Sequence, residues 1–312
     1  MTPYILINFD GAPARRGLGD DFTFVDFPPQ GPLPDQDVRA AARIIVTGQA
    51  GLSREQMDLL PALGLIHVWG AGYDRIDLAA AREKKILVSY DSGNNAVSVA
   101  DHAFALLFAL MRNIPQLSAL TKQGNWRRNV QPPALPTGKR IGIVGMGRIG
   151  ERIARRGEAF EMTVGYHTRR PRADLPWRHF QSARELAQNA DILVVALPGG
   201  ASTHHMIDGD VLTALGPKGF LINVGRGSVV DTQALIRALE TAGIAGAGLD
   251  VYEDEPRIPA SFSRLDNVIL TPHIAGWAPE VHEAAVALFR KNVDRFLRDE
   301  VLITPVPTQE GT

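Results

Sequence analysis

The chain has 312 residues, a formal net charge of −1 at pH 7 and no cysteine. This length predicts about two domains, and a hydrophobic content of 45% suffices for buried cores, which excludes a disordered or low-complexity protein. The balanced charge argues against a nucleic-acid-binding protein, and the lack of cysteine excludes disulfides, thiolate metal sites and thiol catalysis.

The first residues carry no targeting signal. Tyr4–Phe9 is typical of a strand, and neither a basic segment nor a cleavage site accompanies it. The longest apolar stretch, Ala96–Met111, is interrupted by Ser98, Asp101 and His102 and is too short to span a bilayer, so it predicts a buried helix. We therefore expect a cytoplasmic protein with no membrane partner.

Short β-branched runs alternate with helical patterns along the chain. A first series predicts strands at Tyr4–Phe9, Ile44–Val46, Leu65–Val68 and Ile86–Val88. Its helices are predicted at Arg54–Leu60, Asp77–Glu83 and from Ala96 onward. A second series predicts strands at Arg140–Val144, Thr163–His167, Ile192–Ala196, Phe220–Val224, Ala247–Asp250 and Val268–Leu270. The later helices are predicted at Ile149–Phe160, Thr232–Thr241 and Pro279–Leu297.

This alternation predicts parallel sheets with crossover helices, and the continuously apolar strands indicate that both faces of each sheet are covered. Two series predict an α/β protein with two doubly wound parallel-sheet domains, Rossmann-like or flavodoxin-like, and a cleft between them. We expect residues 1–95 and 280–312 to form one domain, and residues 96–279 to form a second domain inserted into it.

A glycine-rich turn joins the predicted strand Arg140–Val144 to the helix after it. In this G-x-G-x-x-G spacing, Gly145 allows a tight turn, Gly147 lets backbone approach a pyrophosphate and Gly150 lets the helix pack closely on the strand. Free N–H groups at the helix start would face the phosphates. We expect a dinucleotide site, with a purely structural turn as the alternative. Its expected contacts are Gly145, Met146, Gly147, Arg148, Ile149 and Gly150.

The next strand ends without the acidic residue that NAD sites usually place there to bind the ribose 2′-hydroxyl. His167 and Thr168 stand at this position, and Arg169 and Arg170 follow them. A 2′-phosphate carries close to two negative charges and suits the bidentate hydrogen bonds of arginine. All four residues are expected to contact the cofactor, and NADPH is predicted to be preferred, with NAD possible. The alternative is that the arginines are solvated surface charge.

Three polar residues each follow a different predicted strand of the second series. They are Arg226, Glu255 and His273. Because the carboxyl ends of strands line the ligand crevice of an open α/β sheet, these side chains could converge on one site. Histidine suits proton transfer near neutral pH, since its ordinary pKa is about 6.5, and arginine stays charged and can fork onto a carboxylate. Taken singly, they could equally be a surface cation, a loop acid and a structural histidine.

At this point the chain resembles a known family, the D-isomer-specific 2-hydroxyacid dehydrogenases, and within it the glyoxylate/hydroxypyruvate reductase branch. The resemblance covers nearly the whole chain, and the ordered set of motifs is far more specific than any one of them. The motifs are Trp69–Asp74, Val99–Ala103, Gly145–Gly150, Asn223–Gly227, Asp250–Pro256 and Pro272–Gly276.

The resemblance implies that Arg226 binds the substrate's carboxylate and 2-oxo oxygen, that His273 donates a proton to that oxygen, and that Glu255 holds and polarises the imidazole. Backbone N–H groups around Ala71 and Gly72 would hold the carboxylate. Further cofactor contacts are implied for Leu197, Pro198, Val224, Gly225, Asp250, His273 and Gly276.

The implied reaction is NADPH-dependent reduction of a small 2-oxo acid, such as glyoxylate or hydroxypyruvate, to a D-2-hydroxy acid. Residues 96–279 would bind the dinucleotide and form a homodimer, and residues 1–95 with 280–312 would bind substrate. The alternatives are the same fold acting on an aromatic 2-oxo acid, phosphite or formate, or a non-catalytic NAD(P)-binding sensor like the corepressors of this fold. Glu255 disfavours formate, because the related formate dehydrogenases usually pair the histidine with glutamine.

Several other residues have more than one interpretation. Trp277 either lines the substrate pocket or packs at a hinge, and Asp101 with His102 is expected to form a satisfied polar pair or an interface contact. His204 and His205 could suggest a metal, but adjacent residues are not expected to share a face and no third ligand is evident. We therefore expect no metal site and a solvent-facing or cofactor-edge loop there.

Overall fold

The structure is a computed structural model that describes residues 4–9, 15, 21–28, 32–48, 50–127 and 130–307. The chain divides into two compact units. The discontinuous unit comprises Met1–Asn95 and Trp277–Thr312, and the continuous unit comprises Ala96–Gly276. The second boundary thus lies three residues before position 280, where the sequence analysis placed it.

The discontinuous unit is built on a five-stranded, wholly parallel sheet in the order β2-β1-β3-β4-β5. Its strands are β1 (Tyr4–Ile7), β2 (Thr23–Asp26), β3 (Ile44–Thr47), β4 (Leu65–Val68) and β5 (Leu87–Tyr90). Its helices are α2 (Gln36–Ala41), α3 (Arg54–Asp58), α4 (Leu78–Glu83) and α11 (Pro279–Leu297). This strand order is that of flavodoxin-like sheets, in which order reverses between the first and third strands.

The continuous unit holds a seven-stranded parallel sheet in the order β12-β11-β10-β9-β6-β7-β8. Its strands are β6 (Arg140–Val144), β7 (Thr163–His167), β8 (Arg178–Phe180), β9 (Ile192–Val195), β10 (Phe220–Asn223), β11 (Gly246–Leu249) and β12 (Val268–Leu270). Its helices are α5 (Ala96–Met111), α6 (Ile114–Lys122), α7 (Arg148–Ala159), α8 (Ala183–Gln188), α9 (Gly209–Leu215), α10 (Thr232–Glu240) and the short 3₁₀ turns η2 (Gly227–Val229) and η3 (Ala260–Arg264). The order reverses between β6 and β9, as in dinucleotide-binding sheets.

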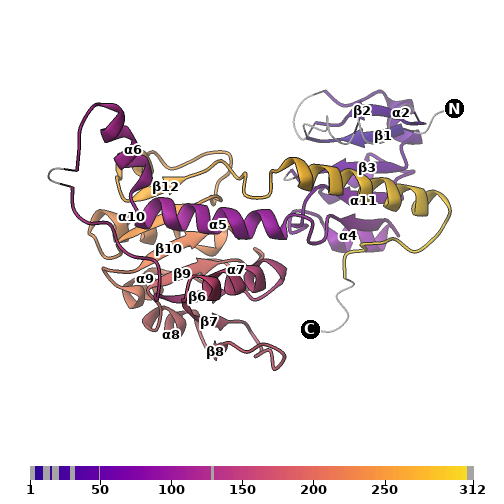
Figure 1. Ribbon diagram of the computed structural model, residues 1–312. Coiled ribbons are helices and arrows are strands. Elements are labelled where there is room, and N and C mark those ends of the chain that lie inside the picture. The colour runs from indigo at the N-terminus through magenta and orange to yellow at the C-terminus, as the bar shows by residue number, and fades with distance from the viewer. Residues whose placement is uncertain are drawn as a thin grey trace. The chain divides into compact units, whose positions relative to one another are not determined.

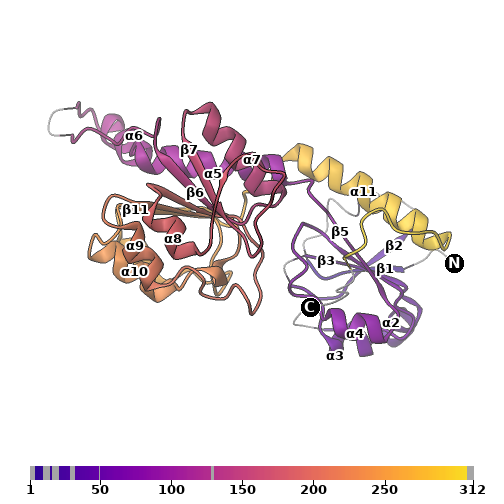
Figure 2. The ribbon, with the colours of Figure 1, turned by 90° about the horizontal axis from the view of Figure 1, so that it is seen from below.

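Each sheet is covered on both faces, which is why its central strands are mostly apolar, whereas the edge strands β2 and β8 are partly exposed. In the discontinuous unit, Phe289 and Val293 of α11 pack on one face, and α3 and α4 pack on the other (Figure 2). In the continuous unit, α5 and α7 cover one face and α8, α9 and α10 cover the other (Figures 1 and 2). The predicted α/β class with two doubly wound parallel sheets is confirmed.

Most strand positions match the sequence prediction, but short edge elements were missed. β2 and β8 lie at sheet edges, and β8 has only three residues, too few to show a period. α2 was also missed, because it buries no residue completely and so carries no apolar stripe. Within the described residues, no single helix is long and apolar enough to cross a membrane, and α5 with α6 passes only as a pair bent by 58°.

Candidate active site on the continuous unit

The predicted site residues of the continuous unit follow the carboxyl ends of its strands. Because all strands of this sheet are parallel, the segments after β6, β7, β9, β10, β11 and β12 emerge at the same edge. β6 and β9 are neighbours at the point where strand order reverses, which is where open α/β sheets bind ligands. The topology therefore brings the glycine-rich turn and the three catalytic candidates to one edge.

Close packing explains two of the three motif glycines. Gly145 adopts φ 99°, and its N–H donates to the His167 carbonyl over 3.0 Å. A Cβ on Gly145 would lie 2.7 Å from the Leu197 Cβ, and one on Gly150 would lie 2.1 Å from the Gly145 carbonyl oxygen. Side chains at either position would force the turn away from β9 or lift α7 from the strand.

Gly147 differs from these two because nothing lies within 4 Å of where its Cβ would be. It is exposed and caps the start of α7 without a side-chain hydrogen bond, so the first N–H groups of the helix lack a side-chain cap. Open space above uncapped helical N–H groups is what an anionic phosphate needs. The turn therefore fits a dinucleotide pyrophosphate.

The segment after β7 presents two arginines. The Thr168 hydroxyl donates to the Arg170 carbonyl over 2.7 Å, which fixes the turn, and His167 Nδ1 lies 2.9 Å from the Phe180 carbonyl oxygen. Arg169 and Arg170 are exposed, and neither forms an ion pair with any described residue. Nearby Arg172 is already committed to Glu151 and Asp174. The two exposed guanidinium groups are thus available to an anionic ligand.

Arg226 lies on a tightly held turn after β10. The Asn223 amide donates to the Arg226 carbonyl over 3.0 Å, and its oxygen accepts from the Gly225 N–H over 3.1 Å. Gly227 packs so closely that a Cβ there would lie 1.8 Å from the Tyr252 carbonyl carbon. The guanidinium is half-buried and Nη1 donates to the Gly225 carbonyl over 2.8 Å. This bond orients the guanidinium.

Glu255 and His273 meet as the sequence analysis predicts. His273 Nδ1 lies 2.9 Å from Glu255 Oε2, and Glu255 Oε1 accepts the Tyr252 N–H over 2.9 Å. The carboxylate is nearly buried, with a 12% exposed side chain, whereas the imidazole is 29% exposed. A carboxylate can only accept here, so Nδ1 carries the proton and Nε2 is the nitrogen that faces a ligand.

Asp250 lies beneath the strand-end segment that carries His273. Its side chain is 1% exposed, and it accepts the Thr271 hydroxyl over 2.6 Å and the N–H groups of Ile274 and Ala275 over 3.0 and 2.9 Å. These bonds tie down the segment in which His273 adopts φ 54°, a conformation rare outside glycine. Asp250 therefore positions the histidine.

His102 also contacts Thr271 and Asp250, and the sequence did not predict these contacts. His102 Nε2 of α5 lies 2.9 Å from the Thr271 hydroxyl oxygen and 3.5 Å from Asp250 Oδ1. Asp101 does not pair with His102 but with Arg156. The expectation of a polar pair between neighbours is wrong, because successive helical residues point in different directions. Burial of a polar residue on an apolar helix was the available signal.

The remaining cofactor candidates line the same edge. Leu197 packs against both Gly145 and Gly225, and Val224 is buried at 6% exposure. Pro198 is exposed and Gly276 is the last residue of the continuous unit.

The predicted substrate residues Ala71, Gly72 and Trp277 belong to the discontinuous unit. Ala71 and Gly72 follow the carboxyl end of β4, after Gly70 at φ 123°. The Gly70 N–H donates to the buried Asp91 carboxylate over 3.0 Å, which anchors the start of this segment. Trp277 is 71% exposed, and its ring centroid lies 6.1 Å from that of His282.

The expectation that the adjacent residues His204 and His205 would not share a face is wrong. The rings of His204 and His205 do share a face, with centroids 3.8 Å apart and planes inclined by 28°. A third possible metal ligand is also present, because both Nε2 atoms approach Glu253 Oε1. His205 has φ 52°, and this left-handed residue breaks the alternation that would have separated the rings.

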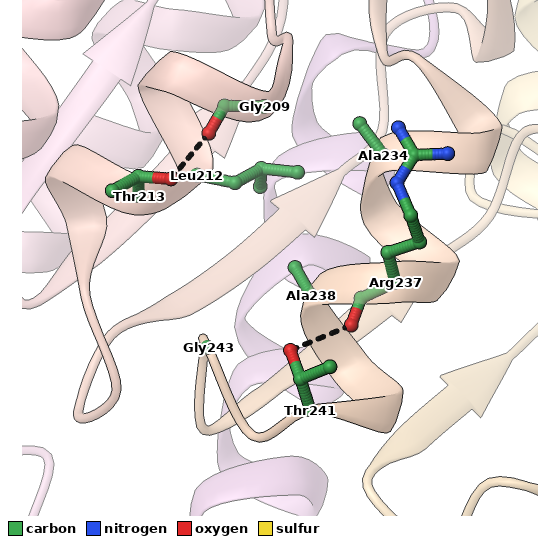
Figure 3. A pocket seen from close by; sticks show the side chains of 8 residues that line it. All are labelled: Gly209, Leu212, Thr213, Ala234, Arg237, Ala238, Thr241 and Gly243. Atoms are coloured by element: carbon green, nitrogen blue, oxygen red, sulfur yellow. Dashed lines mark hydrogen bonds between the residues drawn. The ribbon is translucent and has the colours of Figure 1, made fainter.

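A separate hollow of about 220 Å³ lies between α9 and α10 (Figure 3). Its threonine hydroxyls are already used, since Thr213 donates to the Gly209 carbonyl and Thr241 to the Arg237 carbonyl. Arg237 is then the only charged side chain among its lining residues. The lining of this hollow includes no carboxylate or histidine.

The chain is similar in sequence and fold to several known proteins. A family profile described as "D-isomer specific 2-hydroxyacid dehydrogenase, NAD binding domain" matches residues 104–275. Glyoxylate/hydroxypyruvate reductase A of Arabidopsis thaliana is 38% identical over 264 residues, 84% of each chain. The 2-ketogluconate reductase of Gluconobacter oxydans is 40% identical over 273 residues, 87% of this chain and 88% of that one. The NADPH-dependent glyoxylate/hydroxypyruvate reductase of Sinorhizobium meliloti, solved with NADP and malonate, superimposes with a TM-score of 0.91 at 37% identity, covering 98% of this chain and 97% of that one.

Proposed function

The chain belongs to the D-isomer-specific 2-hydroxyacid dehydrogenases, and from this membership we propose that it reduces glyoxylate or hydroxypyruvate to the D-2-hydroxy acid with NADPH. Membership confirms the resemblance carried by the sequence motifs, and with it the prediction of an oxidoreductase. We further propose which cofactor and substrate it prefers and which role each site residue has.

The observation that carries the proposal is the His273–Glu255 pair at the strand edge that also holds the glycine-rich turn. Glu255 receives Nδ1–H, so a protonated ring holds its second proton on Nε2. Nε2 has no hydrogen-bond partner among the residues that the structure describes, and the ring is 29% exposed. This nitrogen can give its proton to a substrate oxygen and recover it from water.

Arg226 supplies the second requirement, an anchor for a 2-oxo acid. Its guanidinium keeps its charge at all working pH values and can hold a carboxylate oxygen and the neighbouring 2-oxo oxygen together. Bringing positive charge to the 2-oxo oxygen stabilises the negative charge that develops there. Asn223 and the close-packed Gly227 hold the Arg226 turn in one conformation. The backbone N–H groups near Ala71 and Gly72 are proposed to receive the same carboxylate.

A nicotinamide dinucleotide, when bound, supplies the hydride that the chain itself lacks. The N–H groups around Gly147 are proposed to hold its pyrophosphate. Arg169 and Arg170 are proposed to bind a 2′-phosphate, because both are exposed and form no ion pair with a described residue. The absence of an acid at His167 and Thr168 removes the group that would repel that phosphate.

The substrate class follows from the relatives. The structure from Sinorhizobium meliloti was solved with malonate, a small dicarboxylate, and two Arabidopsis thaliana relatives are glyoxylate/hydroxypyruvate reductases. A relative from Plectranthus scutellarioides, 36% identical, is a hydroxyphenylpyruvate reductase, which makes aromatic 2-oxo acids the competing substrate class. Trp277 is proposed to line the pocket that separates these classes. We also propose that the protein is cytoplasmic and forms a homodimer. A solution mass of twice the 33.9 kDa of one chain would support the dimer.

Steady-state kinetics test the proposal. Glyoxylate, hydroxypyruvate, pyruvate and phenylpyruvate are compared with NADPH and with NADH, and the highest kcat/KM is expected for glyoxylate or hydroxypyruvate with NADPH. His273→Ala should lower kcat by about 10² or more, the usual contribution of a general acid. Cofactor binding without turnover on any substrate would favour a sensor instead.

The cofactor preference has its own matched control. Replacing Arg169 and Arg170 together by alanine should weaken kcat/KM for NADPH by about tenfold or more and leave NADH little changed, since a hydrogen bond to a charged group contributes about 1.5–3 kcal/mol. Arg184→Ala removes an exposed arginine from α8 and should change neither value. A wild-type preference for NADH would overturn this part of the proposal.

A further inference from the structure

A cluster of three potential metal ligands lies on the continuous unit and has no part in the proposed reaction. His204 and His205 follow β9, and Glu253 follows β11. One ligand atom from each residue lies within 4.8 Å of the other two. The side chains are 55%, 36% and 27% exposed, so an ion from solvent can reach them.

The two imidazoles converge on one carboxylate oxygen. His205 Nε2 lies 2.7 Å from Glu253 Oε1, and His204 Nε2 lies 3.8 Å from the same atom. Bonds of about 2.0–2.2 Å place neighbouring ligands of a tetrahedral ion roughly 3.3 Å apart. The two measured separations bracket this value and differ from it by roughly half an ångström each. For the three atoms to bind one ion, the His205–Glu253 separation must widen and the His204–Glu253 separation must shorten.

The carboxylate is held ready as a ligand. Its second oxygen accepts the Thr232 hydroxyl over 2.8 Å, which is the kind of outer contact that orients metal-binding carboxylates. Burial raises the pKa of Glu253, but the hydrogen bonds from His205 and Thr232 outweigh it and hold this pKa below its ordinary value. Glu253 is thus charged near neutral pH and can serve as an anionic ligand.

The backbone also fixes one histidine. The His205 N–H donates to the Ser228 carbonyl over 2.9 Å, and its φ of 52° turns its ring onto that of His204. The stacked rings, with centroids 3.8 Å apart, both place Nε2 near Glu253 Oε1, so two imidazole nitrogens and one carboxylate oxygen lie together.

We propose that His204, His205 and Glu253 bind one divalent transition-metal ion of the Zn²⁺, Co²⁺ or Ni²⁺ class. Two imidazoles and one carboxylate are a set that these ions favour over Mg²⁺ and Ca²⁺, and water completes the fourth position. The ion joins the segment after β9 to the segment after β11. Through the His205–Ser228 bond it also steadies the turn that begins at Arg226.

Titration of the untagged, full-length protein with Co²⁺ tests the site. Wild type is expected to bind one Co²⁺ per chain with the intense visible absorption of a four-coordinate ion, and Zn²⁺ should displace it. Binding should weaken as the solution is made acidic, because imidazole must lose its proton to coordinate. Zn²⁺ should also raise the unfolding midpoint of wild type.

Variants assign the signal to the cluster. Thr232→Val should weaken Co²⁺ binding by about 10–100-fold, the usual effect of losing an outer contact, and His204→Ala and Glu253→Gln should weaken it further. His282→Ala on the discontinuous unit is the matched control and should bind as wild type does. His204 is 55% exposed, so its variant should fold even if Glu253→Gln does not. No saturable Co²⁺ binding by wild type, or equal binding by His204→Ala and wild type, would overturn the proposal.

Discussion

Each unit fixes the backbone of a proposed site segment with a buried aspartate, but the two aspartates do so differently. In the continuous unit, Asp250 follows β11 and is 1% exposed, and in the discontinuous unit, Asp91 follows β5 and is 4% exposed. Each carboxylate accepts backbone N–H groups of a neighbouring strand-end segment. Each also has a histidine nitrogen close by, 3.5 Å from Asp250 and 3.4 Å from Asp91.

The two aspartates differ in how many of their carboxylate oxygens accept hydrogen bonds. Asp250 accepts hydrogen bonds on both oxygens, from Thr271, Ile274 and Ala275. Asp91 accepts the Gly70 N–H on Oδ2, whereas its Oδ1 has no hydrogen-bond partner within the described part of the chain.

A buried carboxylate oxygen that accepts no hydrogen bond is costly unless another polar group lies close to it. The histidine facing Asp91 Oδ1 is His67, which is 0% exposed, and its Nδ1 lies 2.8 Å from the Ser89 hydroxyl oxygen. The continuous unit therefore holds its aspartate through hydrogen bonds to both carboxylate oxygens, whereas the discontinuous unit uses one hydrogen bond and places a buried histidine beside the second oxygen. The segment that carries His273, the proposed proton donor, has more hydrogen bonds to its aspartate than the segment that begins at Gly70.

The largest effect is expected at Asp250. Asparagine has one acceptor oxygen and one NH₂ group. In Asp250→Asn the NH₂ group, a donor, must therefore face another donor among Thr271, Ile274 and Ala275. We expect a loss of roughly 2–4 kcal/mol in the unfolding free energy of the continuous unit and a lower kcat, because the His273 segment loosens. Hydrogen exchange of the Ile274 and Ala275 amides should accelerate by about tenfold or more. Unchanged exchange at these amides would remove Asp250 from its positioning role.

A smaller effect is expected from the same substitution at Asp91. In Asp91→Asn, the single oxygen of the new amide can still accept the Gly70 N–H. We therefore expect a loss below about 1 kcal/mol for Asp91→Asn but about 1–3 kcal/mol for Asp91→Ala, which leaves that N–H without an acceptor. Urea unfolding and exchange of the Gly70 amide measure both. Equal losses in the two variants would mean that the contact with His67, not the hydrogen bond, carries the stability.

The sequence predicts the parts of this comparison that have a local period or motif. β6, β7 and β12 begin and end where the apolar runs Arg140–Val144, Thr163–His167 and Val268–Leu270 do. The glycine-rich turn was likewise identified from its spacing, and close packing at Gly145 and Gly150 and open space at Gly147 agree with the reasons given for each glycine.

The supporting contacts could not be predicted in this way. His102 and Thr271 are 169 positions apart, and His205 and Glu253 are 48 apart, so no local pattern links either pair. Only the strand order and the left-handed conformation of His205 bring them together. Residue type and burial could indicate that His102 needs a partner, but they could not name it.

An effect as small as that of Asp91→Asn is expected for an aspartate at the opposite end of the strands, outside the core. Asp191 precedes β9, and its carboxylate accepts the Arg140 N–H over 2.9 Å and the Arg140 guanidinium over 2.8 and 3.2 Å. This hydrogen bonding outweighs partial burial and lowers the pKa of Asp191 below its ordinary value. Because the pKa is lower in the folded state, the ionised carboxylate stabilises the protein above its ordinary pKa of about 3.9, and the contribution disappears as the pH falls through the folded value.

Asp191→Asn should therefore lower the unfolding free energy at pH 7 by no more than about 1 kcal/mol, as is usual for an ion pair open to solvent. The difference from wild type should shrink as the pH falls below about 4 and as salt is added, because protonation and screening remove the same interaction. Urea unfolding at pH 7 and pH 3 measures it. A pH-independent loss as large as that of Asp250→Asn would contradict this account, because asparagine can still accept the Arg140 N–H and only the charge is removed.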